Sequence, residues 1–276
     1  MKFTKMHGAG NDYVYVNGLV ETLPEDLPEL SRQMSHRHFG VGADGLILIL
    51  PAEQADVRMQ MFNADGSESE MCGNGIRCLA KYVYERDICR QDALAVQTKC
   101  GVLMMDLEVE DGKVQRVKVD MGEPMLEAEK IPTTLSGATI VQEPLEINNQ
   151  IFEVTCVSMG NPHAVIFVDD ANDSLVLGLG PMLETDARFP QRTNVEFVEL
   201  ISETEVRQRT WERGSGETWA CGTGASAVCV AGVLANKTQR QIRVHLLGGD
   251  LDLHWDEETN HVFMTGGATE VFTGDW

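Results

Sequence analysis

Two segments of the chain carry the same short motif, a cysteine followed by Gly-x-Gly at the start of an apolar run. The first begins at Cys72 and leads into residues 76–84, and the second begins at Cys221 and leads into residues 225–234. Each pattern predicts a helix that begins at the motif. The repetition predicts a chain built from two similar halves.

The segments around the two motifs follow one plan: short strands, a turn, the motif with its long helix, and further strands. Helices are predicted over residues 27–39, 72–87 and 221–236, with partly helical character over 175–188. Strands are predicted over residues 13–16, 46–50, 57–62, 94–99, 101–109, 113–121, 151–158, 163–168, 195–200, 205–211, 241–247, 250–255 and 261–265. The predicted fold class is α+β, with two similar domains, each a curled sheet around a central helix.

A break in this pattern marks the predicted domain boundary. Residues 122–139 begin with Gly122, Glu123 and Pro124 and lack the alternation of the flanking strands. We therefore expect an N-terminal half over residues 1–121 and a C-terminal half over residues 122–265. The tail at residues 266–276 is expected to return to the N-terminal half.

The position of each motif cysteine favours the ionised thiol. Backbone N–H groups and the helix dipole favour negative charge at a helix N-terminus. That location lowers the pKa of a cysteine thiol from its usual value of about 8.5, so thiolate at Cys72 and Cys221 is expected near neutral pH. One such cysteine from each half predicts an active site in a cleft between the domains, where the two thiols face each other.

The other cysteines are expected to be structural. The chain has seven cysteines, an odd number, with no C-x-x-C pair and no spacing typical of a zinc site. We therefore expect neither a disulfide framework nor a bound metal. Cysteine is commonly buried as a small hydrophobic residue, and that is the expectation for Cys78, Cys89, Cys100, Cys156 and Cys229.

The charge and hydropathy of the chain exclude several classes of partner. The formal net charge of −21, from 43 acidic and 22 basic residues, argues against binding to nucleic acid or to an anionic membrane. No apolar stretch approaches the roughly 20 residues of a membrane span. Residues 1–5 lead into a polar turn rather than an apolar signal core, so we expect a cytoplasmic protein.

Several turns around the two motifs carry polar side chains that suit a zwitterionic ligand. Each asparagine alone is more often a turn residue than a ligand, and a single arginine is usually a solvated charge. Together they can hold an amino acid, because arginine grips a carboxylate with two hydrogen bonds while amide and carboxylate oxygens accept from an ammonium group. The candidates are Asn11, Asn63, Asn161, His163, Asn194, Glu212 and Arg213.

At these residues the chain resembles the diaminopimelate epimerase family. The segments that carry the resemblance are 6–12 (MHGAGND), 63–68 (NADGSE), 71–78 (MCGNGIRC), 160–163 (GNPH), 211–218 (WERGSGET) and 220–224 (ACGTG). They follow the family's order from about residue 3 to the C-terminus. Several segments are six or more residues long, which makes the match specific.

The resemblance implies a cofactor-independent enzyme that interconverts LL- and meso-diaminopimelate, for lysine and peptidoglycan precursor biosynthesis. It also implies two similar α+β domains with the site between them, a small-molecule amino-acid substrate, no metal, and a homodimer. Cys72 and Cys221 match the acid/base residues, and His163 and Glu212 match residues that tune the thiols. The matching substrate-binding positions are Asn11, Asn63, Gly73, Asn74, Asn161, Asn194, Glu212, Arg213, Gly222 and Thr223.

Two positions depart from some members of the family. Gly45 stands where some members carry glutamine, so that substrate contact is not transferred to this chain. Phe272 stands where some members carry a tyrosine at a dimer contact. A dimer of this chain would therefore rest on packing there rather than on a hydroxyl group.

The chemistry of the implied reaction explains why two cysteines are needed. The α-proton of an amino acid is a very weak acid, so inverting its carbon without an electron sink needs a base on one face and an acid on the other. One cysteine must be thiolate while the other stays thiol. Backbone N–H groups at the two helix starts can stabilise the carbanion through the substrate carboxylate, and glycine lets the backbone approach closely.

Other functions fit the sequence less well. A cysteine-pair racemase for proline or histidine would share the catalytic pair, so the pair does not exclude it. The asparagine and Glu-Arg matches are what favour diaminopimelate. A non-catalytic binding protein would not need both cysteines with their glycines. The cysteine spacings argue against a redox or zinc protein, and no lysine stands in a recognisable phosphate-binding context for pyridoxal phosphate.

Overall fold

The chain divides into two compact units. The computed structural model describes residues 1–69 and 72–276, so Met71 of the segment 71–78, which carries part of the family resemblance, lies outside the described residues. The first unit comprises Met1–Asp120 and Thr265–Trp276, and the second comprises Met121–Met264. Within the described part of the chain, we find no helix with the length and apolar character that a membrane span requires.

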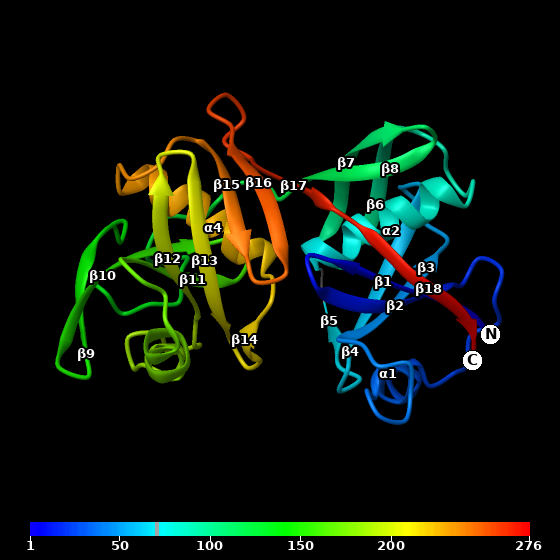
Figure 1. The fold of residues 1–276 in the computed structure, drawn as a ribbon, viewed down its shortest axis with the longest axis horizontal. Helices are drawn as coiled ribbons and strands as arrows, with labels where there is room; N and C mark the ends of the chain where they lie inside the picture. Colours follow the sequence, from blue (N-terminus) through cyan, green and yellow to red (C-terminus); the bar gives the residue numbers. More distant parts are fainter. Residues whose placement is uncertain (70–71) are drawn as a thin grey trace. The chain divides into compact units, whose positions relative to one another are not determined.

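The first unit is a mixed sheet (Figure 1). Its strands are β1 (Lys2–Gly8), β2 (Asn11–Asn17), β3 (Gly45–Leu50), β4 (Val57–Asn63), β5 (Glu68–Ser69), β6 (Ala93–Thr98), β7 (Gly101–Glu110), β8 (Lys113–Asp120) and β18 (Thr269–Asp275). Their order is β18–β1–β2–β3–β4–β6–β7–β8, with the short β5 beside β4. The pairs β2–β3 and β4–β6 are parallel, and the other pairs are antiparallel.

Helix α2 (Gly73–Glu85) lies inside the curve of this sheet. It contacts β1 and β2 towards one end of the strand order and β7 and β8 at the other end, so the sheet curls around it. Its residues Ile76, Leu79 and Val83 follow helical spacing and are fully buried.

Helix α1 (Leu27–Ser35) covers the other face of the central strands. Leu30 and Met34 of this helix share a core with Val14 and Leu46 of β2 and β3. Next to Val14 along β2, Tyr15 points to the opposite face of the sheet, and its hydroxyl group donates to the carbonyl oxygen of Gly75 in α2 at 2.9 Å. Both faces of these strands are therefore covered, which explains their continuous apolar sequence.

The second unit repeats this topology. Its strands are β9 (Glu143–Ile147), β10 (Gln150–Ser158), β11 (Pro162–Val168), β12 (Asn194–Ser202), β13 (Glu205–Glu212), β14 (Gly216–Thr218), β15 (Gln241–Leu246) and β16 (Gly249–Trp255), followed along the chain by β17 (Val262–Gly267). Their order is β9–β10–β11–β12–β13–β15–β16, with β14 beside β13. The pairs β11–β12 and β13–β15 are parallel, so the run from β10 to β16 matches the run from β1 to β7.

Helix α4 (Gly222–Leu234) takes the central place in the second unit. It contacts β10, β11, β12, β15 and β16, and the structure buries residues on all its sides. A helix enclosed in this way carries apolar residues all round. The segments η1 (Ser174–Leu179) and α3 (Gly180–Glu184) lie between β11 and β12 in the chain, as α1 lies between β2 and β3. The predicted fold class, two α+β halves that each wrap a sheet around a helix, is confirmed.

Five strands were absent from the expectation. They are β1, β5, β9, β14 and β18. Strand β1 carries charged and polar side chains among its apolar ones, which hides the strand pattern, and most of β18 is exposed. Strand β14 is only three residues long and forms by pairing with β13.

The expectation of buried cysteines is right at three positions and wrong at two. Cys78, Cys156 and Cys229 are buried. Cys89 is half-buried, and Cys100 is exposed because it occupies the tight turn between β6 and β7. Burial is thus the outcome for cysteines inside helices and strands, and not for those in connections.

We expect a pH-dependent contribution to folding stability at His245 of β15. Its Nδ1 lies 2.8 Å from Asp250 Oδ1 and its Nε2 lies 2.7 Å from Glu205 Oε1. The hydrogen bond to Glu205, with that to Asp250, raises the pKa of His245. The stabilisation is therefore complete below the unfolded pKa of about 6.5 and is lost as pH rises through the folded pKa.

The measurement is urea unfolding of the wild type and of His245→Gln across this pH range. The free energy of unfolding should differ by no more than about 1 kcal/mol at the acid end, because the two carboxylates are exposed and screened. The difference should shrink as pH rises. A difference that stays constant or grows with pH would contradict the assignment.

Candidate active site

Cys72 caps the N-terminus of α2. Its backbone is extended, with φ −134° and ψ 116°, and its Sγ accepts a hydrogen bond from the backbone N–H of Gly75 at 3.4 Å. The sulfur thus occupies the place of the serine or aspartate oxygen in an ordinary helix cap. A side chain at Gly75 has no space, because a Cβ there would lie 2.6 Å from Cδ1 of Ile47.

Asn11 and Asp44 position the Cys72 thiol. The S–H group donates to Asn11 Oδ1 at 3.1 Å, and Asn11 Nδ2 donates to Asp44 Oδ2 at 2.7 Å. A carboxylate can accept hydrogen bonds but cannot donate them, so the NH2 group of Asn11 must face Asp44. Asp44 thereby fixes Oδ1 as the end of the Asn11 amide that faces the sulfur. Asn74 Nδ2 also lies 3.4 Å from Asn11 Oδ1. The structure therefore brings together three predicted residues and adds Asp44, which no sequence signal singled out.

Tyr13 lies near the same sulfur. Burial raises the pKa of this phenol well above its usual value, and Cys72 raises it further, so the hydroxyl group stays protonated and can donate. Gly45 on the neighbouring strand makes room for the ring, since a Cβ there would lie 2.9 Å from Tyr13 Cε1 and 2.2 Å from the Phe62 carbonyl oxygen. The glycine at position 45 is therefore required by packing in this chain.

A buried arginine supports the start of α2. Arg77 is fully buried, and its guanidinium donates to the Gly73 carbonyl oxygen at 3.1 Å and to Asn74 Oδ1 at 2.8 Å. Burial lowers the pKa of Arg77, and the thiol of Cys72 is close enough to interact with its charge. A guanidinium stays protonated at neutral pH, so positive charge lies near Cys72.

Cys221 caps α4 in the same way. Its backbone has φ −119° and ψ 110°, and its Sγ accepts from the backbone N–H of Gly224 at 3.3 Å. The hydroxyl oxygen of Thr223 lies 3.5 Å from the sulfur. A Cβ at Gly224 would lie 2.7 Å from Glu196 Oε1, so this glycine is also required by packing.

The predicted low pKa is wrong for Cys221. Burial raises the pKa of its thiol well above the usual value, and the charges of Glu212 and Glu196 raise it further. A helix N-terminus contributes about 0.3 to 1 kcal/mol, whereas burial of a charged group can shift a pKa by several units. The physical reason is therefore desolvation, which outweighs the helix dipole.

The carboxyl group of Glu212 lies close enough to the Cys221 thiol for the two groups to shift each other's pKa. Burial raises the pKa of the Glu212 carboxyl group, while hydrogen bonds from Thr218 and Cys221 lower it. Thr218 Oγ1 donates to Glu212 Oε1 at 2.5 Å. Glu212 ends β13 and Thr218 ends the paired β14, so the turn between these strands holds the carboxylate beside the sulfur.

A second buried acid lies near this site. Glu196 of β12 and His163 of β11 are both fully enclosed, and Glu196 Oε1 lies 2.8 Å from His163 Nδ1. His163 Nε2 lies 3.0 Å from Oδ1 of Asn161. Sequence reasoning missed Glu196. The available signal was an acid between two apolar residues, Val195 and Phe197, in a predicted strand.

Asn194 and Glu184 hold the loop that carries Arg213. Asn194 Nδ2 donates to the Pro162 carbonyl oxygen at 2.8 Å, and its Oδ1 accepts from the Arg213 backbone N–H at 2.9 Å. Glu184 Oε1 accepts from the backbone N–H of Gly214 at 2.9 Å. The Arg213 side chain is exposed. The amide of Asn194 thus positions its neighbours, and the guanidinium of Arg213 can reach a ligand.

Asn63 lies in the hairpin between β4 and β5. Its Nδ2 donates to Ser67 Oγ at 3.0 Å, and the next residue, Ala64, donates its backbone N–H to the Asp44 carbonyl oxygen at 2.9 Å. The hairpin is thereby attached to the segment that orients Asn11. Within the described residues, no cluster of three or more histidine, cysteine or acidic side chains is arranged to hold a metal ion.

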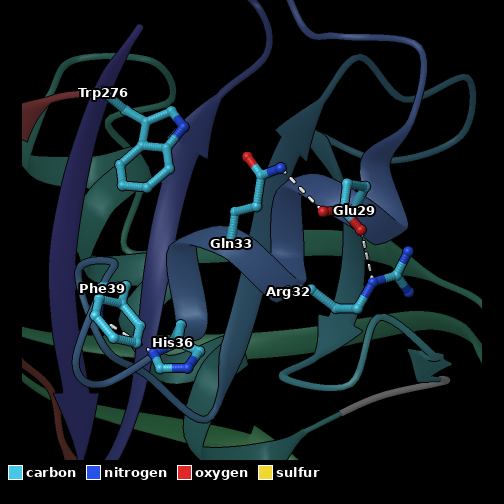
Figure 2. Close-up of a pocket in the computed structure, with 6 residues that line it drawn as sticks. All are labelled: Glu29, Arg32, Gln33, His36, Phe39 and Trp276. Atoms are coloured by element: carbon cyan, nitrogen blue, oxygen red, sulfur yellow. Dashed lines mark hydrogen bonds and ion pairs between the residues drawn. The ribbon is translucent and has the colours of Figure 1, made fainter.

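A separate groove on the first unit contains none of these residues. It is lined by Glu29, Arg32, Gln33, His36, Phe39 and Trp276 (Figure 2). Glu29 accepts hydrogen bonds from Arg32 at 2.8 Å and from Gln33 at 2.9 Å, so the polar groups of α1 there largely satisfy one another.

Solved structures with low sequence identity share the fold. A probable proline racemase from Agrobacterium radiobacter aligns with a TM-score of 0.71 and 15% identity, covering 100% of this chain and 92% of that chain. A hydroxyproline epimerase from Agrobacterium vitis aligns with a TM-score of 0.68 and 14% identity, covering 99% of this chain and 90% of that chain.

Sequence relatives are much closer. A diaminopimelate epimerase from Moorella thermoacetica is 53% identical over 276 residues, covering 100% of this chain and 99% of the relative. One from Desulfovibrio desulfuricans is 55% identical over 283 residues, covering 100% and 98%. The sequence profile of the diaminopimelate epimerase family matches residues 3–127 and 155–271. The chain therefore belongs to the diaminopimelate epimerase family.

Proposed function

We propose that this protein is the epimerase that interconverts LL- and meso-diaminopimelate in lysine and peptidoglycan precursor biosynthesis, with Cys72 and Cys221 as its acid/base pair and with no cofactor. The observation that carries the proposal is the capping of a central helix by a cysteine in each unit. Family membership supplies the substrate, and the two thiols supply the chemistry.

Each sulfur has partners for both of its protonation states. As a thiol, Cys72 donates to Asn11, and as a thiolate it can accept from the Gly75 N–H and the Tyr13 hydroxyl. Cys221 as a thiol donates to Glu212, and as a thiolate it can accept from Gly224 and Thr223. A reversible inversion requires this, because base and acid exchange states with each turnover.

The surrounding charges assign the resting state. The positive charge of Arg77 lies near Cys72, whereas the carboxylates of Glu212 and Glu196 lie near Cys221. Opposite charge favours the ionised form of an acid and like charge disfavours it. We infer that Cys72 is the resting thiolate and Cys221 the resting thiol.

The remaining polar residues are proposed to bind the substrate. Backbone N–H groups in the first turns of the two helices would receive the α-carboxylate, as anions commonly bind there. The fork of Arg213 would receive the second carboxylate, and Glu212 and the asparagine amides would receive the ammonium groups. The proposed binding set is Asn11, Asn63, Gly73, Asn74, Asn161, Asn194, Glu212, Arg213, Gly222 and Thr223.

We further propose a cytoplasmic homodimer that forms through β18. Val271 and Phe272 on this strand are 54% and 46% exposed, and Phe272 packs edge-on against Phe3 with ring centroids 6.0 Å apart. Exposed apolar side chains such as these suit burial against a second copy.

Turnover should depend on both motif cysteines. Cys72→Ala and Cys221→Ala should each slow epimerisation of LL-diaminopimelate by at least about 10²- to 10⁴-fold, the contribution of a general acid or base. Chiral chromatography of the isomers measures the rate, with proline and histidine assayed in parallel.

The matched controls are Cys78→Ala and Cys229→Ala. Burial raises the pKa of Cys78 to about 11 and that of Cys229 to about 12, so both remain thiols inside their helices. These variants should keep near wild-type turnover. Wild-type rates in Cys72→Ala, or faster racemisation of proline or histidine than of diaminopimelate, would reject the proposed function.

The source of the new proton distinguishes two bases from one. In D2O, turnover from LL-diaminopimelate should place deuterium first in the meso product, because the abstracting cysteine retains the substrate proton while the other delivers one exchanged with solvent. Mass spectrometry of the separated isomers early in the reaction reads this directly. Early meso product without deuterium would show that a single base returns the same proton.

The dimer should depend on the apolar face of β18. Phe272→Asp should shift the protein from dimer to monomer in size-exclusion chromatography with light scattering, because a charge would be buried without a partner. Met104→Asp on β7, where the side chain is 53% exposed, is the matched control and should remain dimeric. A wild-type monomer, or equal dissociation of both variants, would disprove this interface.

A further inference from the structure

A chain of hydrogen bonds connects a buried carboxylate with the sulfur of Cys221. Glu196 Oε1 lies 2.8 Å from His163 Nδ1, and His163 Nε2 lies 3.0 Å from Asn161 Oδ1. Asn161 Nδ2 donates to Thr223 Oγ1 at 3.2 Å, and this oxygen lies 3.5 Å from Cys221 Sγ. All five residues belong to the second unit.

The amide of Asn161 gives the chain a direction. Its Nδ2 faces Thr223 and its Oδ1 faces the histidine, so Nε2 of His163 must carry a hydrogen. The Thr223 hydroxyl oxygen receives the hydrogen of Asn161, which leaves its own hydrogen available to Cys221. The end of the chain is thus a donor that suits a thiolate.

Glu196 maintains this direction. Because His163 Nε2 is protonated, the short contact between Nδ1 and Glu196 must contain a second proton, held by the ring or by the carboxyl group. Among the described residues, the other carboxyl oxygen, Oε2, is buried without a hydrogen-bond partner. His163 is therefore the side chain that stabilises the buried carboxylate of Glu196, through the proton that lies between the two groups.

The first unit shows that the fold itself does not need this acid. Tyr13 pairs with Gly45 across β2 and β3, and His163 pairs with Asn194 across β11 and β12. Two residues further along, β3 carries Ile47 where β12 carries Glu196, and both contact the glycine that follows the motif cysteine by three positions. An apolar side chain fills the equivalent place, so packing alone does not account for Glu196.

We propose that Glu196 is a positioning residue for Cys221, acting through His163, Asn161 and Thr223 rather than on the substrate. It keeps a proton on the His163 ring, which keeps the Asn161 amide oriented and the Thr223 hydroxyl pointed at the sulfur. Without the carboxylate, neutral His163 can accept at Nε2, the amide reverses, and Thr223 donates to Asn161 instead. The proposal rests on the proposed function, in which Cys221 alternates between thiol and thiolate.

A double-mutant cycle between Glu196 and Thr223 tests this, because residues that do not touch should otherwise act additively. The variants are Thr223→Val, Glu196→Gln and the double variant. The readout is the rate at which iodoacetamide alkylates Cys221 at a fixed, mildly alkaline pH, followed by peptide mass spectrometry. This rate reports the thiolate fraction of that cysteine and needs no turnover.

Thr223→Val should slow alkylation of Cys221 by about five- to tenfold, the effect of one hydrogen bond lost from a thiolate. In the Glu196→Gln background the same change should have less than about a twofold effect, because the hydroxyl no longer points at the sulfur. A purely structural Glu196 would leave the factor unchanged, and an unchanged factor would overturn the proposal.

Glu199→Gln is the matched control. Glu199 lies on the same strand, and its carboxylate accepts hydrogen bonds from the Ala171 N–H and from Arg207. Neither residue belongs to the hydrogen-bond chain from Glu196 to Cys221. In this background Thr223→Val should keep its full effect. If circular dichroism shows that Glu196→Gln does not fold, Asn161→Asp places an acceptor opposite the Thr223 hydroxyl, draws its hydrogen away from the sulfur and should reduce the effect in the same way.

The two proposals fail separately. A reduced Thr223→Val effect in a protein that does not epimerise diaminopimelate would reject the proposed function and keep the hydrogen-bond chain. Normal epimerisation by the wild type, together with the full Thr223→Val effect in the Glu196→Gln background, would reject the role of Glu196 alone.

Discussion

Each reactive sulfur is fixed by the hydrogen bond with which its cysteine caps a helix. The backbone N–H three residues later donates at 3.4 Å in α2 and 3.3 Å in α4, so the first turn and the reactive atom are held together. Glycine at the donor position avoids displacing a neighbour, because a Cβ would lie 2.6 Å from Cδ1 of Ile47 in the first unit and 2.7 Å from Oε1 of Glu196 in the second. The second glycine of each Cys-Gly-x-Gly motif therefore serves packing as well as the cap.

The two units build this cap from one topology and surround it with different charges. In the first unit the sulfur contacts the neutral Asn11 and Tyr13, and Arg77 supplies positive charge nearby. In the second unit Glu212 and Glu196 supply negative charge. Duplication thus gives two similar geometries, and substitution within them gives the two thiols different tendencies to ionise, as a reaction with one base and one acid needs.

Features that depend on a local sequence pattern could be predicted from the sequence. Features that depend on how strands pair in the folded protein could not. The long apolar runs after Cys72 and Cys221 predicted both central helices, because their signal lies within one segment. The raised pKa of Cys221 was not predictable, since its causes are burial and carboxylates contributed by β12 and β13. Glu196 was missed for the same reason: along β12 it is one of two acids, and only the parallel pairing with β11 brings it to His163.

Burying Glu196 and His163 has an energetic cost that the fold could have avoided. A buried ion pair seldom stabilises a protein more than apolar residues of similar size, and the first unit has Ile47 at the equivalent place. The pair is therefore better explained by the reaction than by stability. In the proposed inversion each sulfur alternates between thiol and thiolate, whereas the charges of Glu212 and Glu196 both favour the thiol of Cys221. In the proposed role of Glu196, the hydrogen-bond chain that ends at Thr223 offers the thiolate a donor that offsets this charge.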